Sequence, residues 1–414
     1  MTGNSILFSH DLRWRELEHW RSNQGHGWPL VPVKNPIGKI VIIGGGFAGL
    51  AAAECLSWQQ HSHEVTLVDS RETSQFLPLL PDIVGHSLPP DIPGYPLKRA
   101  AQRWDFHFQH ARVTSLDLLQ KCVVTDKGNI PYDGLLIASG TETSFKACET
   151  WSKRPLSVDS VDDAVKLRDM AAKDESCHYI VCGGGYTGVE LASNLRYFFR
   201  QRKSQNQVTI VEHGHHLCGA LPRKQVDFIE KAVRQAGIEV KVDTTITELD
   251  QDHVRLADGT VISNARVIWA AGVCTAPFVN DLSFSKNRQG RLAVDSFLAL
   301  DNGIFAAGDA GGFKAGNGEL RMSVQFALTQ GWHAADNILR YLAGHALRPY
   351  RPLDPGWVVP LANGRGCGTI LGLEIYGRLP YVLHTLVCMA RSVGLTNRLQ
   401  LARHYWKQGF SGKQ

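Results

Sequence analysis

The sequence is constrained most by a strand–glycine loop–helix–strand unit that occurs twice. The first copy has an apolar strand over residues 39–43, a glycine-rich loop, a helix over 47–58 and a second strand over 64–68. The second copy has the same order, with a strand at 178–182, a helix at 186–199 and a strand at 208–211. Continuous apolar strands of this kind are typical of a parallel sheet covered on both faces. The repeat predicts an α/β fold with two Rossmann-like dinucleotide-binding domains.

The first glycine loop reads Gly44-Gly45-Gly46-Phe47-Ala48-Gly49. The first glycine of such a loop allows the tight turn, the second lets the backbone approach a pyrophosphate, and the third lets the helix pack on the sheet. The following helix presents unpaired N–H groups and its positive dipole end to phosphates. Asp69 closes the next strand, where an acid holds ribose hydroxyls. This context favours a nucleotide site over an ordinary glycine turn.

The second loop, Gly183-Gly184-Gly185-Tyr186-Thr187-Gly188, has the same three glycine positions, and Glu212 closes its second strand. An acid at that place favours the free 2′-hydroxyl of NAD(H) over the 2′-phosphate of NADP(H). His213, His215 and His216 follow as a surface turn, and their spacing does not suggest a metal site. Two fingerprints in one chain indicate that a hydride carrier meets a second bound redox cofactor.

Further strands suggest how the two domains are nested. Apolar strands at 134–140 and 266–272 each end in a glycine turn, and a third, at 304–307, leads into Gly308-Asp309. The simplest assembly inserts the second domain between the halves of the first. The expected parts are an N-terminal extension (1–38), the two halves of the first domain (39–145 and 277–345), the inserted domain (146–276) and a C-terminal region (346–414).

Composition excludes several other classes of protein. The net charge of +5 is too small and too dispersed to indicate nucleic-acid binding. None of the nine cysteines forms a CxxC pair, which argues against a zinc ribbon or a thioredoxin-type dithiol, and no metal site is expected. No stretch approaches the roughly 18 consecutive apolar residues of a membrane-spanning helix.

Several segments together resemble the two-dinucleotide-binding-domain flavoproteins, and among them the type II NADH:quinone oxidoreductases. The resemblance covers about residues 39–410. It rests on Phe76-Leu77-Pro78-Leu79-Leu80, on the strand from Tyr132 to Thr141, on Trp269-Ala270-Ala271-Gly272-Val273, on Ile304-Phe305-Ala306-Ala307-Gly308-Asp309 and on Gly394-Leu395-Thr396-Asn397-Arg398-Leu399.

The resemblance implies FAD in the first domain and NAD(H) in the inserted one. The expected FAD-binding residues are Gly44, Gly46, Phe47, Ala48, Gly49, Asp69, Ser70, Ser139, Gly140, Asp309 and Gln325. The expected NAD-binding residues are Gly183, Gly185, Tyr186, Thr187, Gly188, Glu190, Glu212 and Gly272.

The resemblance also implies two catalytic residues, Glu190 and Gln325. Glu190 would orient the nicotinamide or serve proton transfer where the two cofactors meet; the plainer interpretation is a carboxylate that gains ~0.3–1 kcal/mol from the helix dipole. A quinone would accept the electrons beside a helix with an AQxAxQ pattern in the family. Here Gln325 is kept, but Thr329 occupies the second glutamine position and Gln330 follows it. Gln330 points about 100° further around the helix, so it need not replace the missing glutamine.

The C-terminal segment 379–406 is expected to form two helices broken near Gly394. Apolar and aromatic residues beside cations are typical of helices in a membrane interface, although a helical lid with a basic solvated face has the same composition. The resemblance favours a peripheral membrane protein, on the cytoplasmic face or on an organellar inner membrane, and allows a homodimer through this region.

Two alternative functions stay open at this point. A sulfide:quinone reductase would need two cysteines at the flavin, for which Cys148, Cys274 and Cys367 are the candidates, although Glu212 argues for NADH. A flavoprotein redox sensor of the apoptosis-inducing-factor kind would bind NADH with little turnover. Its partner surface would be the tryptophan-containing segment 1–38.

Overall fold

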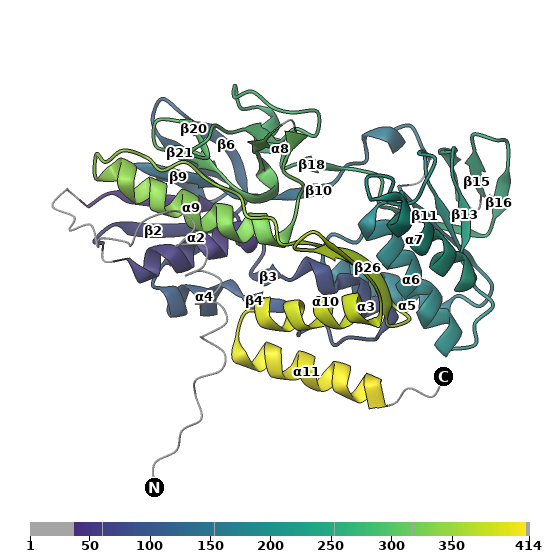
Figure 1. Ribbon diagram of the computed structural model, residues 1–414. Helices are drawn as coiled ribbons and strands as arrows, with labels where there is room; N and C mark the ends of the chain where they lie inside the picture. Colours follow the sequence, from purple (N-terminus) through teal and green to yellow (C-terminus); the bar gives the residue numbers. More distant parts are fainter. Residues whose placement is uncertain (1–36, 60, 153, 252, 317, 411–414) are drawn as a thin grey trace, which may run out of the picture. The chain divides into compact units, whose positions relative to one another are not determined.

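The computed structural model describes residues 37–59, 61–152, 154–251, 253–316 and 318–410, so the N-terminal extension lies almost wholly outside the described residues. The chain divides into two compact units (Figure 1). The first unit comprises Met1–Ser74, Tyr95–Glu142 and Val273–Asp354, and the second comprises Gln75–Gly94, Thr143–Gly272 and Pro355–Gln414. Each unit contains one copy of the repeated motif, which confirms the predicted α/β class.

The first unit is built on a six-stranded sheet in the order β20-β21-β9-β1-β2-β5. Its strands are β1 (Lys39–Ile43), β2 (Glu64–Asp69), β5 (His107–His110), β9 (Gly134–Ile137), β20 (Ala299–Asp301) and β21 (Ile304–Ala306). All neighbouring strands are parallel except β20, which pairs antiparallel with β21. The strand that leads into Gly308-Asp309 therefore lies beside β9, as the nested arrangement predicts.

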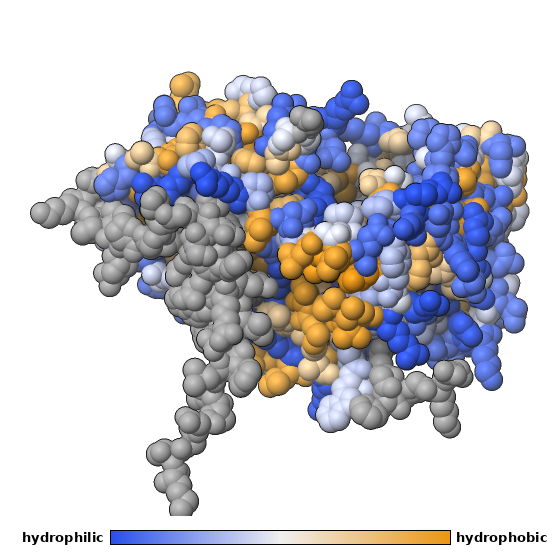
Figure 2. Space-filling view, in the orientation of Figure 1, coloured by the Kyte–Doolittle hydropathy of each residue, from blue (hydrophilic) through white to orange (hydrophobic). Residues whose placement is uncertain are grey.

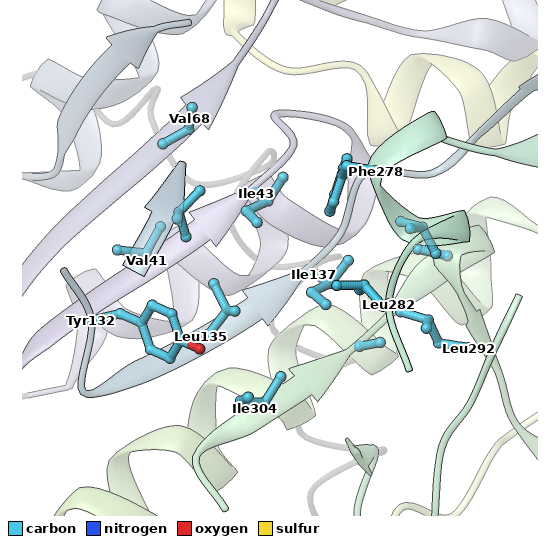
Figure 3. Packing of buried hydrophobic residues seen from close by; sticks show 14 of the residues in the cluster. Val41, Ile43, Val68, Tyr132, Leu135, Ile137, Phe278, Leu282, Leu292 and Ile304 are labelled. Carbon is cyan, nitrogen blue, oxygen red and sulfur yellow. The ribbon is translucent and has the colours of Figure 1, made fainter. Parts of the chain in front are cut away.

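Both faces of this sheet are covered. On one side, α9 (Val324–Leu342) packs against α2 (Phe47–Trp58) and β9. On the other, side chains of β1, β9 and β21 such as Val41, Ile137 and Ile304 join Phe278 of α8 (Pro277–Asn280) and Val123 of the antiparallel sheet β6-β7-β8 in one core (Figure 3). The three strands of that small sheet are β6 (Val113–Asp117), β7 (Cys122–Thr125) and β8 (Gly128–Pro131).

The second unit repeats the plan with a four-stranded sheet in the order β13-β12-β11-β17, parallel throughout. Its strands are β11 (His178–Cys182), β12 (Gln207–Val211), β13 (Glu239–Lys241) and β17 (Ala265–Trp269). The helices of this part are α5 (Val161–Lys173), α6 (Tyr186–Gln201) and α7 (Arg223–Gln235), and an antiparallel sheet follows, of β14 (Ile246–Leu249), β15 (His253–Leu256) and β16 (Val261–Ser263).

The C-terminal region contains the two expected helices and a sheet that the sequence did not suggest. The helices are α10 (Arg378–Arg391) and α11 (Leu395–Phe410), and they are preceded by an antiparallel sheet of β25 (Gly356–Leu361), β26 (Arg365–Ile370) and β27 (Leu373–Gly377). The glycine-rich sequence of these strands lacks the alternation that signals a sheet. Alternating side chains are replaced by close backbone approaches, since a Cβ on Gly368 would lie 2.3 Å from the carbonyl oxygen of Trp357.

The compact units differ from the expected domains at two places. Residues from 346 onward were expected to form a separate region, but 355–414 belong to the unit that holds the second glycine loop. Gln225 of α7 shows why: its amide donates to Gly368 O at 3.1 Å and to Thr369 Oγ1 at 2.8 Å. Residues 75–94, expected within the first domain, belong to the second unit through α3 (Leu80–Gly85), which packs against α6.

Shorter elements complete the described chain: β3 (Thr73–Gln75), η1 (Leu77–Leu79), β4 (Gly94–Pro96), α4 (Leu97–Trp104), β10 (Thr141–Thr143), η2 (Lys146–Cys148), β18 (Val273–Thr275), β19 (Leu292–Ala293), η3 (Gly308–Ala310), β22 (Gly311–Gly312), β23 (Lys314–Ala315) and β24 (Gly318–Glu319). No helix among the described residues is long and apolar enough to span a bilayer.

Candidate cofactor-binding sites

The first glycine loop joins β1 to α2 in a geometry that only glycine permits. Gly44 has φ +103°, and a Cβ there would lie 2.3 Å from the carbonyl oxygen of Ala138. A Cβ on Gly49 would lie 1.8 Å from the carbonyl oxygen of Gly44. Gly46, by contrast, faces open space, with no atom within 4 Å of its Cβ position. This open backbone, followed by Phe47 and Ala48 at the start of α2, matches the part of the loop that approaches a pyrophosphate.

Asp69 is tied to the first loop by its own carboxylate. Oδ2 accepts a hydrogen bond from Gly45 N at 2.6 Å, and Oδ1 accepts one from Arg71 N at 2.7 Å. Ser70 follows at the exposed end of β2, where its carbonyl oxygen accepts from the His110 ring at 3.0 Å. The acid predicted to meet a ribose is therefore held in place by backbone donors on both oxygens.

The second glycine loop reproduces these features in the second unit. Gly183 has φ +107°, and a Cβ there would lie 2.6 Å from the carbonyl oxygen of Ala270. A Cβ on Gly188 would lie 1.8 Å from Gly183 O, whereas Gly185 faces open space. Tyr186 and Thr187 are exposed at the start of α6. Gly272 is also exposed, with φ +126°.

Backbone donors hold both carboxylate oxygens of Glu212, as they hold those of Asp69. Its Oε2 accepts from Gly184 N at 2.5 Å and its Oε1 from Gly214 N at 2.7 Å. The two loops thus share a turn, an open second glycine and an acid bonded to the loop. Such a repeated arrangement can bind two dinucleotides.

Ser139 provides an independent test of the first site. Its Oγ is buried and has no hydrogen-bond partner among the described residues. A buried hydroxyl without a partner is costly unless a ligand satisfies it. The next residue, Gly140, has φ +68° and open space at its Cβ position. The unpaired hydroxyl of Ser139 and the open backbone at Gly140 together could accommodate a polar cofactor.

The turn after β21 depends on a buried arginine that the sequence did not single out. Arg291 is 3% exposed, and its guanidinium donates to the carbonyl oxygens of Asp309 (3.0 Å), Leu320 (3.0 Å) and Gly311 (2.5 Å). Burial raises the pKa of the Asp309 carboxyl, and the charge of Arg291 partly opposes that rise. An isolated arginine between Gly290 and Leu292 carries no sequence signal for this task.

The three residues expected beside a quinone differ in their surroundings. Gln330 is 1% exposed, and its Oε1 accepts from Gly308 N at 2.8 Å. Thr329 is also buried; its hydroxyl lies 3.1 Å from Gln325 O and 2.7 Å from the hydroxyl of Tyr350. Gln325 itself is half-buried in the first turn of α9. Gln330 and Thr329 therefore face the interior of the first unit, and Gln325 has more access to a ligand.

Glu190 lies in α6, two residues after the last glycine of the loop. Burial raises the pKa of its carboxyl to about 8, and the negative charge of Asp82 adds to the rise. This carboxyl is therefore placed to carry a proton near neutral pH. A perturbed carboxyl of this kind is typical of functional sites.

The candidate sulfur-carrying cysteines lack the features of reactive thiols. Cys148 and Cys367 are buried in the second unit, and Cys274 is half-buried in the first. All three are free thiols. Burial raises the pKa of Cys148, and it raises that of Cys367 to about 12. Because the thiolate is the reactive form, these two side chains are poorly suited to sulfur transfer. In the described part of the chain, no group of three or more His, Cys, Asp or Glu side chains could hold a metal ion.

Known proteins of similar sequence are oxidoreductases by name. The chain is 28% identical over 373 residues to demethylphylloquinone reductase NdbB of Synechocystis, covering 85% of this chain and 92% of that protein. It is 25% identical over 418 residues to a type II NADH:quinone oxidoreductase of Haemophilus influenzae, covering 88% of this chain and 94% of that protein.

Solved structures share the fold at lower identity. NDH2 of Plasmodium falciparum in complex with NADH matches with a TM-score of 0.79 at 16% identity, over 92% of this chain and 99% of that chain. The sulfide:quinone oxidoreductase of Aquifex aeolicus matches with a TM-score of 0.73 at 16% identity, over 85% of this chain and 90% of that chain.

A family model, pyridine nucleotide-disulphide oxidoreductase, matches residues 38–331, which include both glycine loops and the Gly308-Asp309 turn. The chain belongs to the pyridine nucleotide-disulphide oxidoreductase family.

Proposed function

We propose that this protein is an FAD-dependent NADH:quinone oxidoreductase of type II. The observation that carries the proposal is the pair of equivalent loops, each closed by an acid that bonds to its own loop: Asp69 to Gly45, and Glu212 to Gly184. Two such sites serve an enzyme in which a nicotinamide delivers hydride to a bound flavin. The names of the relatives support NADH as donor and quinone as acceptor.

FAD would be held in the first unit, where the flavin supplies the hydride acceptor. The open backbone at Gly46 would take the pyrophosphate, Asp69 the ribose, and Ser139 would donate its unsatisfied hydroxyl to the cofactor. Asp309 would meet the ribityl or phosphate portion, and Arg291 keeps that turn in place. These residues bind and orient the cofactor.

NADH would be held in the second unit by Gly185 and Glu212. Since both oxygens of Glu212 already accept backbone N–H groups, a ribose hydroxyl would donate to a lone pair that remains on the carboxylate. A 2′-phosphate would instead bring like charges together, so this arrangement favours NADH. Glu190 would orient the nicotinamide and hold a proton there.

The quinone would meet the protein through Gln325. Of the three residues considered for this role, Thr329 and Gln330 already bond to Tyr350 and Gly308, and both are buried. Thr329, which stands at the position of the second glutamine, directs its hydroxyl to Tyr350 in the interior of the unit. The quinone contact on this helix would then depend on one glutamine where the family pattern has two.

A lipid-soluble acceptor implies access to a membrane, and α10 and α11 offer a surface for it. Large apolar side chains are exposed along both helices, and Figure 2 shows apolar residues gathered over this region. They are Leu379, Val382, Leu386, Val387, Leu395, Leu399 and Trp406. Of the exposed cations, Arg403 lies among them in sequence, and Arg378 and Lys407 flank them. Apolar and cationic side chains together are suited to the interface of an anionic bilayer. We propose peripheral attachment through this surface.

A steady-state assay with NADH, NADPH, sulfide and a panel of quinones tests the proposal. The expected result is quinone reduction driven by NADH, a lower kcat/KM with NADPH, and no reduction with sulfide. Reduction by sulfide would instead identify a sulfide:quinone reductase. Tight NADH binding with negligible turnover on every quinone would identify a redox sensor, and either result would contradict the proposal.

A further inference from the structure

The connector, the segment of residues 348–354 that follows α9, runs back along that helix within the first unit (Figure 1). Its first residue is bonded to the second half of α9. The side-chain amide of Asn337 donates to the carbonyl oxygen of Arg348 and accepts from its N–H, both at 2.9 Å. His333 Nε2 donates to the same carbonyl oxygen at 2.8 Å. Because Asn337 and His333 are four residues apart, they hold the connector against one face of the helix.

Tyr350 continues this attachment toward the start of α9. Its hydroxyl lies 2.7 Å from Thr329 Oγ1, and both side chains are buried. Thr329 stands four residues before His333, so it belongs to the same face of the helix. Its own hydroxyl donates to the helix, where the carbonyl oxygens of Gln325 and Phe326 lie 3.1 Å and 3.3 Å away. A threonine hydroxyl has a single proton, so Tyr350 is the donor to Thr329.

The ring and the backbone of Tyr350 are fixed as well. Its N–H donates to the carbonyl oxygen of Ser296 at 2.7 Å. The ring packs edge-on against Phe313, with 5.1 Å between the centroids. Burial raises the pKa of Tyr350 to about 12, so the hydroxyl keeps its proton at neutral pH and stays a donor. The bond to Thr329 is therefore a permanent feature of this face of α9.

The far end of the connector is bonded just before α9 begins. Arg321 Nη2 donates to Asp354 Oδ1 at 2.7 Å, and Nη1 donates to the other carboxylate oxygen. The guanidinium of Arg321 also lies over the ring of Phe326, 5.2 Å from its centroid. The connector thus bonds the chain on both sides of Gln325, four residues before it at Arg321 and four residues after it at Thr329.

We propose that Tyr350 is a positioning residue for the quinone contact at Gln325, acting through Thr329 to fix the first turn of α9. The inference rests on the proposed function, in which Gln325 meets the quinone. The ends of helices fray, and Gln325 is the second residue of this one. An amide contacts a quinone oxygen well only over a narrow range of distance and angle, so a fixed first turn favours binding.

This role gives the departure at Thr329 a function. A glutamine at that position would offer a second amide, whereas the short threonine hydroxyl reaches the carbonyl oxygen of Gln325 and leaves room for the phenol of Tyr350. The chain has a pair of hydroxyls that hold one glutamine, in place of a second glutamine. Loss of either hydroxyl should therefore weaken the quinone contact and leave the transfer of hydride from NADH to flavin intact.

The test measures the KM of menadione and of decylubiquinone with NADH, and the Kd of the same quinones for the oxidised holoenzyme from quenching of flavin fluorescence. Tyr350→Phe removes one hydroxyl and keeps the ring, and Thr329→Val removes the other at similar volume. Each should raise KM and Kd roughly twofold to tenfold, as expected for the loss of one neutral hydrogen bond. NADH oxidation with ferricyanide, which needs no quinone site, should stay at the wild-type rate.

Two further variants separate positioning from general support of the fold. In a Gln325→Ala background, Tyr350→Phe should raise neither constant further, because both changes act on one contact. Thr329→Ser returns a hydroxyl and should restore the constants that Thr329→Val raises. Tyr179→Phe is the matched control: this phenol is buried in the second unit and donates to Asp174 Oδ2 at 2.6 Å. It should lower the midpoint of thermal unfolding and leave both quinone constants unchanged.

Unchanged constants in Tyr350→Phe, or an equal loss of ferricyanide activity, would overturn the inference while the proposed function stands. If Thr329→Val does not fold, judged by its thermal unfolding, Asp354→Asn takes its place, because it loosens the exposed end of the connector and should raise the same constants. A wild-type protein that binds quinone with the expected shifts in the variants, but does not reduce it with NADH, would refute the proposed function alone. A wild-type protein that neither binds nor reduces quinone would overturn both.

Discussion

The carboxylates of Asp69 and Glu212 each have two roles at the glycine loops. Each acid stands where a ribose is expected, and each also accepts a backbone N–H from its own glycine loop. Charge-assisted hydrogen bonds of this kind are shorter and stronger than neutral ones, and those at Gly45 and Gly184 measure 2.6 Å and 2.5 Å. Substituting either acid should therefore affect the shape of the loop as well as the contact with the cofactor.

Replacing Glu212 with Ala should erode the preference for NADH. The substitution removes an acceptor for the 2′-hydroxyl and a negative charge that disfavours a 2′-phosphate. Loss of a charged hydrogen bond costs about 1.5–3 kcal/mol, so the NADH to NADPH ratio of kcat/KM should fall roughly tenfold or more. Glu248→Ala, which removes an exposed acid from the same unit, should leave the ratio unchanged. A wild-type protein that prefers NADPH would contradict this interpretation of Glu212.

At the scale of single residues, much of the site could be predicted from the sequence, because local geometry fixes where the glycines and the acids stand. Gly44 and Gly183 stand in the expected loops with positive φ, and Asp69 and Glu212 stand at the ends of the expected strands. The contacts of Arg291, and the hydrogen bond from the Tyr405 hydroxyl to Asp82, could not be predicted. They join segments that only the folded chain brings together. No local pattern encodes a partner 323 residues away.

At the scale of elements, the contact between α2 and α9 depends on a glycine. A Cβ on Gly331 of α9 would lie 2.0 Å from the carbonyl oxygen of Ala48 in α2. Ala48 is also the second residue of α2, beside the first glycine loop. The packing of α9 therefore bears directly on the shape of the FAD site.

Gly331→Ala should lower the free energy of unfolding by about 1–3 kcal/mol or more, because the helices must separate to admit a methyl group. It should also weaken FAD retention. Denaturant unfolding and flavin absorbance after gel filtration measure the two effects. Gly318→Ala is the matched control, since no atom lies within 4 Å of that Cβ position. Equal stability of the two variants would show that the contact at Ala48 does not constrain α9.

The elements that the sequence predicted best are those with continuous apolar runs. β1, α2 and β11 have the expected bounds, and α6 ends at Gln201, two residues beyond its expected end. The sheet β25-β26-β27 was missed because Gly356, Gly366 and Gly368 make close backbone contacts in place of alternating side chains. The division into compact units also departed from the expected domains, since α3 and the C-terminal region pack within the second unit.

At the scale of the whole molecule, a soluble donor and a lipid-soluble acceptor must both reach one protein in the proposed reaction. The chain supplies two nucleotide loops and, on α10 and α11, a surface of exposed apolar side chains. Pro380, Thr385 and Cys388 of α10 are buried, so removing these helices would uncover interior residues. Point substitutions on the exposed side chains are therefore the sharper way to test membrane attachment.

The double variant Leu399→Glu, Trp406→Glu should bind anionic phospholipid vesicles at least about tenfold more weakly. Each substitution replaces an apolar side chain whose burial contributes about 1.5–3 kcal/mol with a charge that anionic lipid repels. Leu399 and Trp406 are 62% and 67% exposed, so the fold should tolerate the change. Leu119→Glu alters a 95% exposed leucine in the first unit and should bind as wild type does. Vesicle sedimentation measures all three proteins, and unchanged binding of the double variant would refute attachment through α11.

The central claim is that one chain carries FAD and passes it hydride from NADH for delivery to quinone. Rapid mixing followed by flavin absorbance tests this claim most directly. The account predicts that the purified protein is yellow, that NADH bleaches the flavin band within the mixing time, and that added quinone restores it. A protein without flavin absorbance, or a flavin that NADH leaves oxidised, would contradict the account.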